Sequence, residues 1–265
     1  MALVEFARSG RTLLERLTDA SAIAVVPVGA TEQHGPHLPP SVDTLIAEAV
    51  VRAAAKRCSA TVFVTPPIAF GVSAHHLGLP GTLSLGSDTF RAVVGDVAGS
   101  LVHAGARTVL FVNGHGGNRS VLADAVQRAG RRTTRDRASV LAAPRILATT
   151  YWELVSDGRA TLRDGPAGTT GHAGAFETSI MLHLAPETVA MELAVDAVPK
   201  APFPGFSSDL FESPTVHGWV DFRDASPSGV FGAPSRATRE KGKAAVDAVA
   251  TALAALFDRL IPKHG

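Results

Sequence analysis

Apolar runs rich in β-branched residues alternate along this chain with segments whose apolar residues recur at helical spacing. Four runs are predicted strands, at residues 22–30, 61–69, 106–113 and 138–144. Helical spacing predicts helices over residues 43–57, 87–103, 118–129, 178–184 and 240–260. Strands separated by helices of this length are typical of βαβ units, which predicts an α/β fold with helices on both faces of a parallel sheet. Pro27 cannot donate to a neighbouring strand, which favours an edge position or a bulge near the end of the first strand.

The chain length allows one large domain or two small ones. Its 265 residues contain no internal repeat and no shift in composition that would mark a linker, so a single domain over residues 1–265 is expected. Two segments, 151–174 and 200–235, are rich in Gly, Pro, Thr and Asp and lack periodicity. Long irregular segments in a compact domain are usually functional, so these loop-rich inserts are expected to cover a site.

Charge and hydropathy exclude several classes of partner. The net charge is +1 with acids and bases interspersed, so no basic surface for nucleic acid or an anionic membrane is expected. The longest nearly apolar stretch, 248–257, is shorter than the roughly 20 residues that cross a bilayer. The first residues lack the continuous apolar core of a signal peptide. A soluble, cytoplasmic protein is expected, with the lone Cys58 as a packed thiol.

Carboxylates and imidazoles follow two of the predicted strands. Glu32 and His34 come just after strand 22–30, and His115 just after strand 106–113, while Asp43 opens the next helix. Ligands of open parallel sheets bind beyond the carboxyl ends of the strands. Oxygen and nitrogen ligands without a nearby cysteine suit Zn²⁺, Mn²⁺ or Fe²⁺. The pattern indicates a metal-dependent hydrolase.

A second polar cluster, residues 170–179, leaves two interpretations open. Glu177 and Thr178 can be first-turn helix residues favoured by the helix dipole, with His172 a capping or surface group. Alternatively His172 is a proton shuttle, suited to that work by an ordinary pKa near ~6.5, and Glu177 is a further ligand or base.

Four motifs, in this order, carry a family resemblance: TEQHGPHLP followed by Asp43, FGVSAHHLGLPGTLSL, VLFVNGHGGN and GHAGAFETSIML. With them the chain resembles the creatininase family of amidohydrolases from about Ile23 to Leu184, and more weakly over 232–242. The resemblance implies a three-layer α/β/α domain with a mostly parallel sheet and two divalent metal ions (Zn, Mn or Fe). It also implies a homo-oligomer, usually a hexamer.

The resemblance also implies roles for individual residues. The residues of the family that match Glu32, His34, Asp43 and His115 bind the metals, and the aspartate bridges both ions. The residue matching His172 is the catalytic histidine. Those matching His76 and Trp152 contact the substrate. His37 and His75 are expected behind the ligands or at the surface.

Two positions depart from creatininase itself. Gly117 stands where that enzyme has a glutamate ligand, and Gly168 where it has a tryptophan. The GHGGN version resembles other branches, including formamide deformylases and the peptidase that matures mycofactocin. Because two divalent ions need more than the carboxylates of Glu32 and Asp43, Glu177 is the candidate for the missing ligand.

The predicted function is hydrolysis of a C–N amide bond in a small cyclic or linear amide. A peptidase acting on a short modified peptide is the second hypothesis, and a formamide deformylase the third. A metal-binding scaffold subunit without catalysis is the alternative from a different class. The retained ligand set and His172 argue against the scaffold.

Overall fold

The centre of the molecule is a five-stranded sheet, seen in a computed structural model that describes residues 3–134, 143–158, 162–163 and 165–261. The strands are β1 (Leu3–Glu5), β2 (Ala22–Val28), β3 (Thr61–Val64), β4 (Thr108–Asn113) and β5 (Arg145–Thr150). Their order is β1-β3-β2-β4-β5, and all neighbouring pairs are parallel. The carboxyl ends of the strands therefore lie together at one edge of the sheet.

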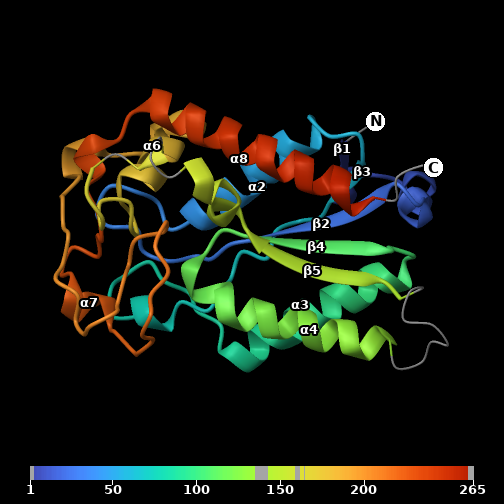
Figure 1. The fold of residues 1–265 in the computed structure, drawn as a ribbon, viewed down its shortest axis with the longest axis horizontal. Helices are drawn as coiled ribbons and strands as arrows, with labels where there is room; N and C mark the ends of the chain where they lie inside the picture. The colour runs from blue at the N-terminus through green and yellow to red at the C-terminus, as the bar shows by residue number, and fades with distance from the viewer. Residues whose placement is uncertain (1–2, 135–142, 159–161, 164, 262–265) are drawn as a thin grey trace.

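Helices cover both faces of this sheet (Figure 1). One face carries α2 (Val42–Ala55), α6 (Ala175–Leu184) and α8 (Arg239–Leu260), and the other carries α3 (Ser87–His103) and α4 (Arg119–Thr134). The short helices α1 (Arg11–Leu14) and α7 (Phe222–Ala225) belong to the connecting segments. The arrangement confirms the predicted three-layer α/β/α fold. Among the helices of the described residues, none combines the length and the apolar run that a bilayer span requires.

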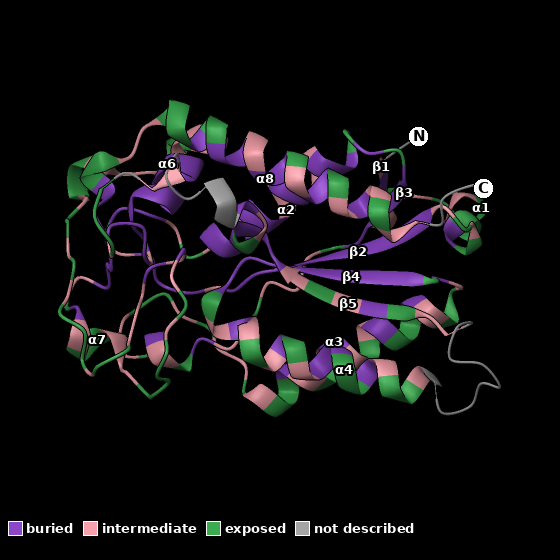
Figure 2. Cartoon of the chain, viewed as in Figure 1, coloured by how far each residue is buried: buried purple, intermediate pink, exposed green. Residues whose placement is uncertain are grey.

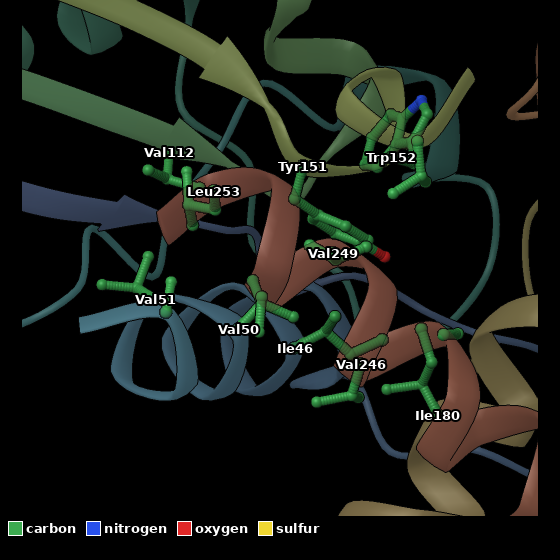
Figure 3. Close-up of a cluster of buried hydrophobic side chains, with 14 of the residues drawn as sticks. Ile46, Val50, Val51, Val112, Tyr151, Trp152, Ile180, Val246, Val249 and Leu253 are labelled. Carbon is green, nitrogen blue, oxygen red and sulfur yellow. The ribbon is translucent and has the colours of Figure 1, made fainter. Parts of the chain in front are cut away.

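Alternation along the strands divides the core into two halves. In β2, Ile23 and Val25 pack with the α2–α8 side, whereas Ala24 and Val26 pack with the α3–α4 side. Every residue of β2 is buried, as expected for a parallel strand covered on both faces. Figure 2 shows burial concentrated along β2 and β4, and Figure 3 shows the apolar side chains gathered between α2 and α8.

Gly242 sets how closely α8 approaches α6. A Cβ atom at this position would overlap the backbone carbonyl of Ser179, so only glycine permits the contact. Ile180 and Val249 are buried in the same part of the core (Figure 3). This packing fixes α6 against the sheet and thereby fixes the direction of its first turn.

The edge position predicted from Pro27 is wrong, and the bulge lies in the neighbouring strand. β2 is central, between β3 and β4. Val25 pairs with Val64 and Val28 with Ile68, so the strand opposite β2 has one extra residue between these pairs. The missing donor of Pro27 therefore falls where the ladder to β3 is already interrupted.

Two other strands differ from the sequence-based expectation. The strand predicted over 138–144 lies mostly outside the described residues. The strand that pairs with β4 is β5, which begins directly after residue 144. β1 was not expected because three residues are too few to show a pattern. The described parts of 151–174 and 200–235 form turns and short helices, and the single domain stays a prediction.

Candidate metal centre and active site

Five buried ligand-type side chains lie together at the carboxyl edge of the sheet. The segment after β2 supplies two of them, the turn after β4 supplies one, and the first turns of α2 and α6 supply the others. They are Glu32, His34, His115, Asp43 and Glu177, each at most 3 % exposed. The structure thus brings together five residues from four segments of the chain, as the sequence predicted for Glu32, His34, His115 and Asp43.

His34 presents a bare nitrogen to two carboxylates. Its Nδ1 lies 3.0 Å from the backbone carbonyl of Glu32, and because a carbonyl only accepts, Nδ1 carries the hydrogen. Nε2 is therefore unprotonated in the neutral ring, 3.2 Å from Asp43 Oδ1 and 3.8 Å from Glu177 Oε2. A histidine that anchors one nitrogen on a carbonyl and aims the other at carboxylates has the arrangement of a metal ligand.

His115 repeats this arrangement on the other side of Asp43. Its Nε2 donates to the carbonyl of Val72 at 3.1 Å. Nδ1 then lies bare, 3.1 Å from Asp43 Oδ2 and 3.2 Å from Glu32 Oε1. Asp43 therefore shows one carboxylate oxygen to each histidine, which is the geometry of a bridging ligand.

Three buried polar atoms of this cluster lack a hydrogen bond within the described residues: Glu32 Oε2, His34 Nε2 and Asp43 Oδ2. All three are acceptors, and burying acceptors without a partner is costly. Glu32, His34 and Asp43 each bring one ligand atom within 4.8 Å of the others, as do His34, His172 and Glu177. Divalent cations would satisfy these atoms, so the donor set fits the two ions that the sequence predicted.

Without a cation, the cluster must hold protons instead. Burial opposes charge on His34, yet Asp43 and Glu177 raise its pKa to about 9. Burial raises the pKa of the Glu177 carboxyl to about 7. Both values exceed those of an unfolded chain, so the stability they contribute is present at low pH and lost as pH rises through the folded values.

This gives a pH-dependent prediction for the metal-stripped protein. We expect the free energy of unfolding to fall by roughly 3 kcal/mol between about pH 6.5 and about pH 9 from His34 alone. His115 acts in the same direction, because although burial opposes its charge, Glu32 and Asp43 raise its pKa well above the ordinary value. Urea unfolding at a series of pH values measures it. The zinc-loaded protein is the control and should change less, because the cation takes the place of the proton. An equal pH dependence with and without metal would contradict this account.

The predicted catalytic histidine faces the same cluster. His172 Nε2 donates to the backbone carbonyl of Gln33 at 2.7 Å, and its Nδ1 lies 3.5 Å from Glu32 Oε1. Its ring centre is 4.2 Å from that of His34. Burial lowers the pKa of His172, which keeps the ring neutral and Nδ1 able to accept a proton. The next residue, Ala173, has φ of 54°, a strained conformation of the kind found at functional sites.

A cavity of about 810 Å³ opens from the centre. Both predicted substrate-contacting residues, His76 and Trp152, line it, and the indole Nε1 of Trp152 has no partner among the described residues. Its outer wall is the segment 206–222, part of one predicted insert. Exposed Trp219 belongs to this wall.

The structure decides between the two alternatives for His37 and gives His75 a closer place than expected. His37 is buried, with Nε2 3.0 Å from Thr178 Oγ1, so the surface alternative is wrong for it. His75 lines the cavity and stacks on His115, with ring centres 5.8 Å apart. Its nitrogen lies within 4.8 Å of ligand atoms of Glu32 and His115, a proximity that the sequence did not indicate.

Gly117, the departure from creatininase, has no room for a side chain. A Cβ here would overlap the carbonyl of Val72 and lie 2.5 Å from His115 Nε2, the two atoms that anchor the histidine. We expect Gly117→Ala to weaken metal binding about 10- to 100-fold by disturbing this anchor. Metal titration of the purified variant measures it.

The neighbouring glycine offers a matched control for that variant. A Cβ at Gly116 meets nothing within 4 Å, so Gly116→Ala should bind metal as the unchanged protein does. Equal affinities for Gly117→Ala and Gly116→Ala would show that the His115 anchor does not govern metal binding.

Two contributors to the site were missed by the sequence analysis. Gln33 contacts both His76 and His172, and Phe222 packs against His76 with ring centres 4.5 Å apart. Gln33 stands between two candidate ligands, which was an available signal. Phe222 lies in an irregular segment, and nothing in its local sequence indicates that it reaches the centre.

The comparisons with known proteins point to one family. The family model described as "Creatininase: Creatinine amidohydrolase" matches residues 10–257. A mycofactocin precursor peptide peptidase of Mycobacterium ulcerans is 36% identical, with 83% of this chain and 78% of that protein covered. The creatinine amidohydrolase of Pseudomonas putida is 31% identical, covering 86% and 85%.

Solved structures of creatininase have the same fold. A structure titled "Creatininase Mn" has a TM-score of 0.84 at 27% identity and covers 99% of both chains. A creatininase variant of Zn–Zn type has a TM-score of 0.81, also at 27% identity and 99% of both chains. The family match over nearly the whole chain, the relatives above 30% identity and the shared fold lead to one conclusion: this chain belongs to the creatininase family of amidohydrolases.

Proposed function

We propose that this chain hydrolyses a carbon–nitrogen amide bond with two divalent ions. The residues proposed to hold them are Glu32, His34, Asp43, His115 and Glu177. The observation that carries the proposal is Asp43, whose two oxygens face bare nitrogens of two different histidines. Glu32 would complete one ion site and Glu177 the other. Glu177 would thus supply the carboxylate that creatininase takes from the glutamate at the position of Gly117.

The proposed reaction divides the work between the ions and the protein. When bound, such ions lower the pKa of water from 15.7 towards ~7 and polarise a carbonyl group. His172 Nδ1 would accept a proton of the attacking water and pass it to the leaving nitrogen. A carbon–oxygen bond forms and the carbon–nitrogen bond breaks, giving a carboxylic acid and an amine. Zn²⁺, Mn²⁺ and Fe²⁺ all suit this ligand set.

The leading substrate class is a small cyclic or linear amide, held between His76 and Trp152 in the cavity. A short modified peptide is the second candidate. The cavity favours it, because about 810 Å³ is in the range that holds drug-sized ligands rather than a single small ring. The relative named mycofactocin precursor peptide peptidase also supports it.

A metal-restoration screen tests the proposal. The protein is stripped with a chelator, reloaded with Zn²⁺, Mn²⁺ or Fe²⁺ in turn, and assayed for ring opening of creatinine and for amine release from N-formyl amines and short peptides. We expect hydrolysis only after reloading. Metal binding without hydrolysis of any amide would favour the scaffold alternative.

We also propose a homo-oligomer, with a hexamer as the expected size from the family resemblance. Analytical ultracentrifugation of the full chain determines the size. A monomer at all concentrations would exclude it.

A further inference from the structure

Gln33 is held in one orientation by contacts at both ends of its amide. The backbone N–H of Gly35 donates to Gln33 Oε1 at 2.9 Å, and Gln33 Nε2 donates to the carbonyl of Gly229 at 3.1 Å. Gly229 has φ of 73°, and a Cβ there would collide with the amide, so the chain closes tightly around it. The oxygen and nitrogen of this side chain therefore cannot exchange places.

This orientation determines which nitrogen of His76 carries the hydrogen. Gln33 Nε2 lies 2.8 Å from His76 Nδ1, and since Nε2 can only donate, Nδ1 must accept. The hydrogen of the neutral His76 ring is then on Nε2. That N–H faces the metal cluster, 3.4 Å from Glu32 Oε1, a distance long for a hydrogen bond, and His76 is one of the residues that line the cavity.

Gln33 also fixes which nitrogen of His172 carries the hydrogen. His172 Nε2 lies 2.7 Å from the backbone carbonyl of Gln33, so it donates there and cannot also accept from Gln33 Nε2 at 3.1 Å. Its bare Nδ1 faces Glu32 Oε1 at 3.5 Å. The two rings, with centres 4.3 Å apart, have the same tautomer but turn different nitrogens to the centre. One offers a hydrogen and the other offers a lone pair.

We propose that Gln33 is a positioning residue that makes His76 the hydrogen-bond donor for the carbonyl oxygen of the scissile amide. This inference rests on the proposed hydrolysis. Negative charge develops on that oxygen as water adds, and a fixed donor aimed at it is worth about 10²- to 10³-fold in rate. Phe222 packs against the His76 ring, with ring centres 4.5 Å apart, and helps to hold the ring in place. His172 remains the acceptor for the proton of the water, so the two rings do not compete for one role.

Nitrogen NMR of the histidine rings tests the tautomers without any assay of activity. In long-range ¹⁵N–¹H spectra of the zinc-loaded and the metal-stripped full chain, His76 should show a bare Nδ1 and a protonated Nε2. His76→Gln and His172→Gln identify the signals by their loss. A protonated Nδ1, or a bare Nε2 in the zinc-loaded protein as in a metal ligand, would overturn the inference.

Gln33→Glu tests the positioning role. A carboxylate at the position of Nε2 requires a donor, so His76 Nδ1 should become protonated. The same substitution at Gln127, exposed on α4, is the matched control and should leave the ring unchanged. A bare Nδ1 in Gln33→Glu would show that Gln33 does not set the tautomer.

Kinetics on whichever amide the wild type hydrolyses complete the test. At equal metal content, His76→Ala and Gln33→Glu should each lower kcat about 10²-fold or more with little change in KM. His76→Gln, which restores an N–H donor, should recover part of the loss. Wild-type rates in His76→Ala would overturn the donor role of His76. If the wild type hydrolysed no amide, the proposed function would be overturned, and the NMR spectra alone would decide whether Gln33 sets the tautomer.

Discussion

Replacing Asp43 by alanine should remove both metal ions and hydrolysis together. Asp43 faces His34 Nε2 with one oxygen at 3.2 Å and His115 Nδ1 with the other at 3.1 Å, so its loss opens both ion sites at once. We expect the metal content to fall to background and kcat to fall by at least ~10³-fold, as expected when the group that ionises water is lost. Elemental analysis of gently purified protein, with an assay on the same sample, measures both.

Asp88 offers a matched control for this experiment. It is also an acidic residue in the first turn of a helix, α3, but its side chain is fully exposed and pairs with Arg91. Asp88→Ala should keep the metal and the activity. If Asp43→Ala also retained two ions per chain, the bridging role would be wrong, and with it the two-ion centre.

Replacing His172 by alanine should separate metal binding from catalysis. The His172 ring donates to the carbonyl of Gln33 and directs Nδ1 towards the centre. The ligand atoms on either side of Asp43 are still present when His172 is removed. Removing a proton-transfer group typically costs about 10²- to 10⁴-fold in rate. We therefore expect kcat to fall by that factor while the metal content is unchanged.

A histidine elsewhere on the surface controls for the change of side chain. His103, exposed at the end of α3, has no place in the site, and His103→Ala should behave as the wild type. Loss of one ion in His172→Ala would reassign His172 as a ligand, which its position near His34 and Glu177 makes a real alternative. Unchanged kcat would remove it from the mechanism.

The convergence of four candidate ligands was predictable from the sequence. Glu32, His34 and His115 follow strands, and Asp43 opens the helix that follows one of them. In a parallel sheet the carboxyl ends of the strands lie at the same edge. Residues just beyond neighbouring strands are therefore close together whatever conformation the loops adopt. β2 and β4 are indeed neighbours, which is why the prediction needed no tertiary detail.

The role of Glu177 was left open because it depends on where α6 lies. The helical pattern placed Glu177 near the start of a helix but could not aim that helix at Asp43. Its direction is fixed by the close contact of Gly242 with Ser179, between segments far apart in the chain. The helix was predicted to begin at residue 178, whereas α6 begins at Ala175, so Glu177 lies inside the first turn and not just before it.

Local pattern therefore determined the fold class and the identity of four ligand candidates, because strand and helix periodicity and the parallel order of βαβ units are encoded over short stretches. Only the tertiary structure decided which nitrogen His115, His172 and His76 turn inward. Those choices rest on single hydrogen bonds to Val72, Gln33 and Gly229, atoms contributed by loops distant in sequence. Backbone carbonyls of this kind have no sequence signature, since every residue carries one.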